Sequence, residues 1–217
     1  MYDLCIKNGH IVDDVQNFEG SIIVNNGKIV ALLSKDSILP ETKEIYDAKG
    51  KFVFPGAVDP HVHLNDPGLT DSEDFYTGTC AAAAGGVTTV CEHPFTDPLP
   101  DNLKDYRDKQ EIADKKCIVD YCLWGACSHE NYEELKKMLD YGAIGFKAFL
   151  PYSAEVPAIN DKRLLKHMRL LAEKDTVLAV HCENDEVIQE KKEQINPSEY
   201  GNPIKFAESR PPLAEIE

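Results

Sequence analysis

The sequence is short of positive charge, of long apolar runs and of targeting signals. Its 217 residues carry 23 Lys and Arg against 38 Asp and Glu, which gives a formal net charge of −15 at pH 7. Because proteins bind phosphates through clustered Lys and Arg, we expect no nucleic-acid partner. No window approaches the ~20 consecutive apolar residues that a membrane helix needs, and the amino terminus does not resemble a signal peptide. These absences predict a cytoplasmic protein without a membrane partner.

The cysteines also lack the spacing of a structural zinc site. There are seven, an odd number, and no two form a CxxC pair. Free cysteine behaves as a small buried hydrophobe in a reducing compartment, so we expect most of these thiols to be reduced and to lie in the core.

The remaining composition, 42% hydrophobic and 28% charged residues, is that of an ordinary globular protein. The first part, residues 1–51, contains short strand-like runs separated by turns, and Asn26-Gly27 is a strong hairpin signal. We therefore expect a small β unit at residues 1–51 and a second domain at residues 52–217.

The second domain alternates short apolar runs with helical stretches, which is the pattern of successive βα units around a parallel sheet. The expected strands are 52–64, 86–93, 118–126, 143–150 and 176–184, and the expected helices are 72–85, 103–116, 131–142 and 161–175. In the last helix, Leu164, Leu165, Met168, Leu171 and Ala172 are predicted to share the buried face. The fold class is α/β, either an open doubly wound sheet or part of an eight-stranded barrel.

Two histidines stand two residues apart in the first of these runs, "FPGAVDPHVHLNDPG" (residues 54–68). Side chains at i and i+2 of a strand point to the same side, so the imidazoles of His61 and His63 can both reach one metal ion. Taken alone, the pattern also fits the polar face of an ordinary strand.

A lysine and a third histidine stand in the fourth and fifth runs. Lys147 lies within "AIGFKAFL", where burial would disfavour the charged ammonium and leave a nucleophilic amine. It could reach out to solvent, form a Schiff base, or become a carbamate that bridges two metals. His181 ends an apolar run in "VLAVHCEN". Because parallel strands end at one edge of a barrel, these residues together with the His61-x-His63 pair predict an active site there.

The sequence resembles a known family over essentially its whole length. The residues that carry the resemblance are "PGAVDPHVHLNDPG", "TGTCAAAAGGVTTV", "GFKAFL", "VHCEN" and "ESRPPLAEIE". In this order they are similar to the cyclic amidohydrolases of the amidohydrolase superfamily, the group of allantoinases, hydantoinases or dihydropyrimidinases, and dihydroorotases.

The resemblance implies a (β/α)8 TIM-like barrel, of which about five strands would be present, with a small amino-terminal β-sandwich. It also implies two divalent ions, zinc in this interpretation, bridged by a hydroxide and by a carbon dioxide-derived carbamate on Lys147. His61 and His63 would bind the more buried ion, and His181 the second. The bridging hydroxide would open a small cyclic amide or ureide substrate. A homo-oligomer is expected for the full-length form.

Three further positions bear on the substrate. Asn65 stands where dihydroorotases have an arginine for the orotate carboxylate, which favours an allantoin-type ring. Tyr152 falls where hydantoinases and dihydropyrimidinases have a tyrosine that hydrogen-bonds the substrate and the developing oxyanion. Thr96 replaces a substrate-contacting asparagine, and its hydroxyl cannot reproduce the amide's paired donor and acceptor. We interpret the neighbouring His93 as structural.

Residues 1–217 lack counterparts of the family's later segments. The resemblance places there the remaining strands, a further histidine and the general-base aspartate, so we expect activity to belong to a complete protein. One hypothesis is the amino-terminal part of a metal-dependent hydrolase that opens an allantoin- or hydantoin-type ring. The alternative is a truncated or non-catalytic amidohydrolase-like subunit or interaction module. A Schiff-base aldolase using Lys147 would leave the paired histidines unexplained.

Overall fold

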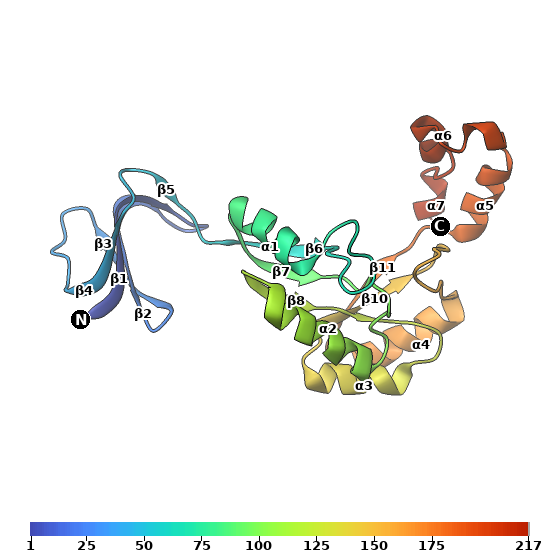
Figure 1. Ribbon diagram of the computed structural model, residues 1–217, viewed down its shortest axis with the longest axis horizontal. Helices are drawn as coiled ribbons and strands as arrows, with labels where there is room; N and C mark the ends of the chain where they lie inside the picture. Colours follow the sequence, from blue (N-terminus) through green and yellow to red (C-terminus); the bar gives the residue numbers. More distant parts are fainter. Residues whose placement is uncertain (217) are drawn as a thin grey trace. The chain divides into compact units, whose positions relative to one another are not determined.

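The computed structural model describes residues 1–216 and divides into two compact units after Gly56 (Figure 1). The boundary follows β5 (Phe52–Val53), which pairs with β1 (Tyr2–Val12) and so belongs to the first unit. The expected single strand at 52–64 is therefore wrong. Its first residues extend the amino-terminal sheet, and its later ones form β6 (Ala57–Val62) of the second unit.

The first unit is one mixed sheet, in which β1 pairs antiparallel with β2 and parallel with β4 and β5. Its strand order is β3 (Lys28–Ser34), β2 (Asn17–Asn25), β1 and β4 (Thr42–Asp47), and β5 also pairs with β1. The predicted hairpin is confirmed at Asn26-Gly27, where both residues have the positive φ that such turns require. Residues 1–56 form no second layer, so the predicted β-sandwich is not confirmed.

The second unit has parallel strands whose spatial order follows the chain order. The first group is β6, β7 (Val87–Glu92) and β8 (Asp120–Leu123), and the second is β9 (Gly125–Ala126), β10 (Gly145–Phe149) and β11 (Val177–His181). Trp124 separates β8 from β9 within the expected strand 118–126. Doubly wound sheets reverse their strand order at a switch point, whereas barrels keep chain order, so this arrangement is an arc of a (β/α) barrel.

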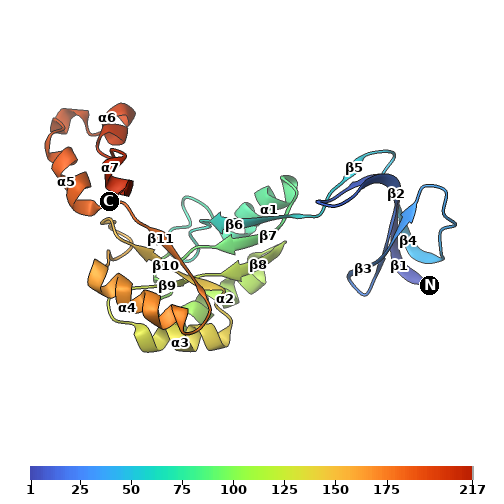
Figure 2. The same cartoon turned by 180° about the vertical axis from the view of Figure 1, so that it is seen from behind.

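Helices connect these strands. They are α1 (Phe75–Ala84), α2 (Leu103–Lys116), α3 (Tyr132–Tyr141) and α4 (Asp161–Ala172), followed by α5 (Asp185–Glu193), a 3₁₀ turn (Pro197–Glu199), α6 (Pro203–Glu208) and α7 (Leu213–Ile216). Asp74, Asn102 and Asn160 cap α1, α2 and α4 by accepting a backbone N–H of the first turn. Figures 1 and 2 show α2, α3 and α4 along one side of the strands. Within residues 1–216, no helix has the length and apolar character to cross a membrane.

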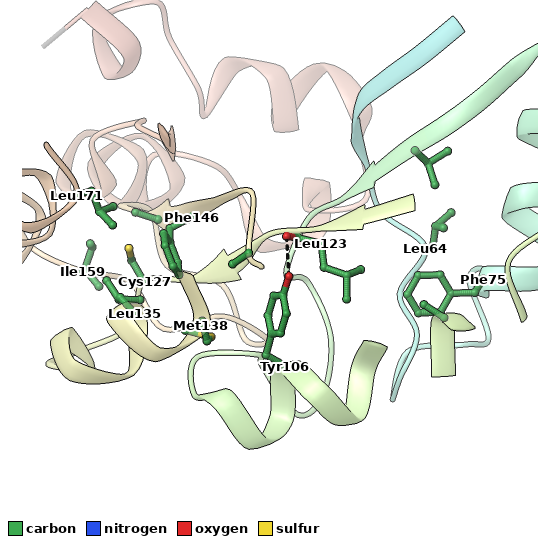
Figure 3. Close-up of a cluster of buried hydrophobic side chains, with 14 residues drawn as sticks. Leu64, Phe75, Tyr106, Leu123, Cys127, Leu135, Met138, Phe146, Ile159 and Leu171 are labelled. Atoms are coloured by element: carbon green, nitrogen blue, oxygen red, sulfur yellow. Dashed lines mark hydrogen bonds between the residues drawn. The ribbon is translucent and has the colours of Figure 1, made fainter. Parts of the chain in front are cut away.

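The core of the second unit lies between the strands and these helices (Figure 3). Phe146 of β10 packs there with Leu135 and Met138 of α3, and all three side chains are buried. Tyr106 of α2 is also buried and donates its hydroxyl to the carbonyl oxygen of Leu123 at 3.1 Å. Apolar packing and one satisfied polar group thus hold the helices against the strands.

The predicted buried face of the 161–175 helix is wrong in part. Leu171 is buried in α4, but the predicted members Leu165, Met168 and Ala172 are exposed. The side chain that takes their place inside is His167, which is tolerated there because its Nε2 donates to the carbonyl oxygen of Ser128 at 2.9 Å. The buried face of α4 therefore includes His167, a polar residue that a search for apolar spacing does not select.

The cysteines are free thiols, as expected. The expectation that most of them lie in the core is wrong. Cys5, Cys91 and Cys127 are buried, three others are partly exposed, and Cys182 is exposed. Burial raises the pKa of the Cys127 thiol to about 12, which keeps it protonated at neutral pH.

Leu135→Ala should lower the free energy of unfolding by about 2–5 kcal/mol, because it removes a buried side chain and leaves a cavity between α3 and β10. Leu165→Ala is the matched control on another helix, and its exposed side chain predicts a change within about 0.5 kcal/mol. Denaturant unfolding of both variants measures the difference. Equal losses would contradict the burial of Leu135 between α3 and β10.

Candidate functional site

The predicted histidine pair lies at the carboxyl end of β6. The Nε2 atoms of His61 and His63 are 3.2 Å apart, and both side chains are exposed at this edge of the strands. Two zinc–nitrogen bonds of about 2.05 Å at a tetrahedral angle would separate their nitrogens by about 3.3 Å. The spacing of these two imidazoles therefore fits shared ligation of one ion.

Lys147 lies on β10, with a residue exposure of 5%. Its Nζ is 5.3 Å from the centre of the Phe149 ring, and within residues 1–216 no oxygen accepts a hydrogen bond from it. Burial lowers the pKa of this ammonium group. A buried lysine without a carboxylate partner is more easily present as the neutral, nucleophilic amine.

His93, which the sequence suggested to be structural, is part of this cluster. Its ring stacks on His61 at 3.8 Å between centroids and on Trp124 at 4.7 Å. Its Nε2 lies 3.3 Å from the carbonyl oxygen of Pro60, whereas Nδ1 is buried without a hydrogen bond. His93 therefore supports the back of the His61 ring.

His181 ends β11, and a carboxylate that the sequence analysis missed holds its ring. Nε2 of His181 is 2.7 Å from Oε2 of Glu183, and Oε1 of Glu183 is 3.5 Å from Nε of Arg210. An Nε2–H bond to this carboxylate leaves the lone pair of Nδ1 free for a metal, the arrangement by which carboxylates orient metal-binding histidines. The sequence does contain a signal for this contact, because a glutamate two residues after a histidine at a strand end can reach the histidine ring.

Aromatic contacts connect the histidines of β6 and β11. Phe95 lies 5.7 Å from His63 and 6.4 Å from Phe149, which stacks on His181 at 6.1 Å. The structure thus brings the histidines and Lys147, predicted from separate strands, to one edge.

A cavity of about 440 Å³ opens beside this cluster. Asn65 and Tyr152, predicted to bind substrate, are among its lining residues, as are His63, His181, Glu183 and Arg210. Thr96, the third predicted contact, is buried outside this lining and donates its hydroxyl to the carbonyl oxygen of Pro98 at 3.0 Å. Its role in substrate binding stays a prediction.

The imidazoles at the site favour their neutral, metal-binding form. Loss of hydration lowers the pKa of His61 and of His63, and the positive charge of Lys147 lowers each further. Burial lowers the pKa of His93 to about 3, and nearby positive charge acts in the same direction. Within residues 1–216, no group of three or more His, Cys, Asp and Glu side chains is arranged to hold a metal.

In metal-free protein, His93 should make the fold less stable as the pH falls. Its pKa of about 3 lies below the ordinary value of 6.5, so only the unfolded chain takes up the proton between these values. The stability that the neutral ring contributes is therefore complete above about pH 6.5 and declines by about 2 kcal/mol between pH 8 and pH 5.

His93→Phe keeps a ring in the stack but cannot bind a proton, so it should remove that part of the pH dependence. Urea unfolding across this pH range measures it, with the exposed His129→Gln as control. Identical slopes for wild type and His93→Phe would contradict the buried neutral imidazole.

Comparisons with known proteins agree with these motifs. The chain is 38% identical over 219 residues to an allantoinase of Desulfitobacterium hafniense and 35% identical over 222 residues to an L-hydantoinase of Paenarthrobacter aurescens. Each alignment covers 100% of this chain and 48% of the relative. The chain thus spans about half the length of the curated relatives it matches.

A solved structure of L-hydantoinase (dihydropyrimidinase) from Arthrobacter aurescens superposes with a TM-score of 0.92 at 33% identity, covering 99% of this chain and 48% of that one. The model of the amidohydrolase family matches residues 52–211, which include every predicted site residue. On this match and these identities, the chain belongs to the amidohydrolase family.

Proposed function

We propose that this chain provides metal-binding residues of a cyclic amidohydrolase that opens an allantoin- or hydantoin-type ring. The observation that carries the proposal is the His61–His63 pair, whose Nε2 atoms are 3.2 Å apart. The pair lies at the same edge of the barrel arc as the buried Lys147 of β10. The relatives named allantoinase and L-hydantoinase support the ring-opening reaction.

The side chains fit a pair of divalent ions, with zinc as the proposed metal. His61 and His63 would hold one ion, and Nδ1 of His181 would be available to the other. Lys147 would hold both after its neutral amine adds carbon dioxide to become a carbamate, because a lysine lacking an acceptor in residues 1–216 can take this form without breaking an ion pair. When bound, such ions supply Lewis acidity and lower the pKa of water.

The chain's other residues would position the substrate. Asn65 and Tyr152 line the same cavity as His63 and His181, so an amide ring placed there would contact polar groups beside the metal ligands. Tyr152 is largely exposed, which leaves its hydroxyl free to donate to a developing oxyanion. The general-base aspartate expected for this reaction would come from outside this chain, so turnover is proposed for the complete protein.

Lys147→Ala in the complete protein should abolish binding of the metal pair, because no other residue would take the bridging position. Metal analysis after zinc loading measures the ions bound per chain. Lys174→Ala, at an exposed lysine, is the control and should bind as the wild type does. Two ions bound by Lys147→Ala with normal turnover would contradict the proposed role.

The substrate class is tested with allantoin, hydantoin, dihydrouracil and dihydroorotate, each supplied to the zinc-loaded complete protein. We expect the highest kcat/KM for allantoin or hydantoin and the lowest for dihydroorotate. Asn65 offers no positive charge to a substrate carboxylate, and Arg210 in the same cavity already contacts Glu183. Preferred turnover of dihydroorotate would contradict this substrate assignment, and absence of turnover on all four rings would contradict the proposed function.

A further inference from the structure

A buried ion pair beside the site has no part in the function proposed above. Oε1 of Glu92, at the end of β7, lies 3.2 Å from Nζ of Lys109 in α2, and the side chains are 0% and 1% exposed. Removing two charges from water is costly, and a well-packed apolar pair of similar volume is often as stable or more so. Packing alone therefore does not explain this pair.

Both charged groups also bind backbone next to the histidines. Oε2 of Glu92 accepts the backbone N–H of Leu64 at 2.7 Å, and Leu64 directly follows His63. Nζ of Lys109 donates to the carbonyl oxygen of His93 at 3.3 Å. The pair thus connects the ends of β6 and β7 to α2 at the point where three imidazoles meet.

The hydrogen bonds favour the charged forms against the effect of burial. Burial raises the pKa of Glu92 and lowers that of Lys109, while the opposite charge of each partner acts against the shift. The N–H of Leu64 further stabilises the carboxylate. An apolar pair in place of Glu92 and Lys109 would leave the backbone N–H of Leu64 without an acceptor.

We propose that Glu92 and Lys109 are positioning residues that set the geometry of the His61–His63 pair as metal ligands. Glu92 fixes the backbone after His63, and Lys109 fixes the backbone of His93, whose ring supports His61 at 3.8 Å. This inference rests on the proposed role of His61 and His63 as metal ligands.

The test uses two double variants of the complete protein, both free of unpaired buried charge. Glu92→Leu with Lys109→Met removes the acceptor for Leu64, whereas Glu92→Gln with Lys109→Met keeps an amide oxygen there. Zn²⁺ affinity is measured by competition with a chromogenic chelator, and folding by the thermal midpoint. The Leu/Met variant should bind Zn²⁺ at least about tenfold more weakly than wild type, and the Gln/Met variant should recover most of the loss.

A role in packing alone predicts a different result, in which Zn²⁺ affinity follows the thermal midpoint and the acceptor makes no difference. Equal Zn²⁺ affinity of wild type and the folded Leu/Met variant would overturn the positioning role while leaving the proposed function intact. Wild type that binds no Zn²⁺ would instead overturn the proposed function, and the positioning role with it.

Amide hydrogen exchange of the metal-free wild type provides a measurement that needs no variant to fold. The Leu64 amide should exchange as slowly as the ladder amides of β6 and β7, because a buried carboxylate accepts it. Exchange as fast as that of the exposed residue Thr70 would overturn the proposal, even if the Leu/Met variant failed to fold.

Discussion

The parallel direction of the strands is the constraint on which the site depends. The strands are parallel within each of the two groups, β6 with β7 and β10 with β11. In a barrel arc the carboxyl ends of such strands lie at one edge, and residues far apart in sequence meet there. His61, Lys147 and His181 come from β6, β10 and β11. The apolar packing of Phe146 against α3 holds β10 in place, so stability of the core and geometry of the site are linked.

The candidate site combines neutral imidazoles with carboxylates that contact an imidazole ring or the backbone beside one. Loss of hydration lowers the pKa values of His61 and His63, which keeps their ring nitrogens unprotonated, as metal binding requires. Glu183 contacts the ring of His181, whereas Glu92 contacts the backbone that follows His63. In this account the two carboxylates orient ligands, and the negative bridging group would come from a modified lysine.

Much of this arrangement could be predicted from the sequence, and the failures have physical causes. The apolar runs at 86–93 and 143–150 predicted β7 and β10 closely, because buried parallel strands are nearly continuous in apolar character. Three features depend on tertiary contacts, which no local pattern shows. They are the chain order of the strands, the absence of a second layer in residues 1–56, and the burial of His167. The Glu92–Lys109 pair was missed because nothing local shows that a residue in α2 reaches the end of β7.

We propose that Lys147 becomes a carbamate that binds metal beside His61 and His63. Carbon-13 NMR of the zinc-loaded complete protein, supplied with ¹³C-bicarbonate, tests it most directly. We expect a carbamate carbon resonance that is retained in the wild type and absent from Lys147→Ala. Two tightly bound zinc ions in the wild type without any carbamate resonance would contradict it.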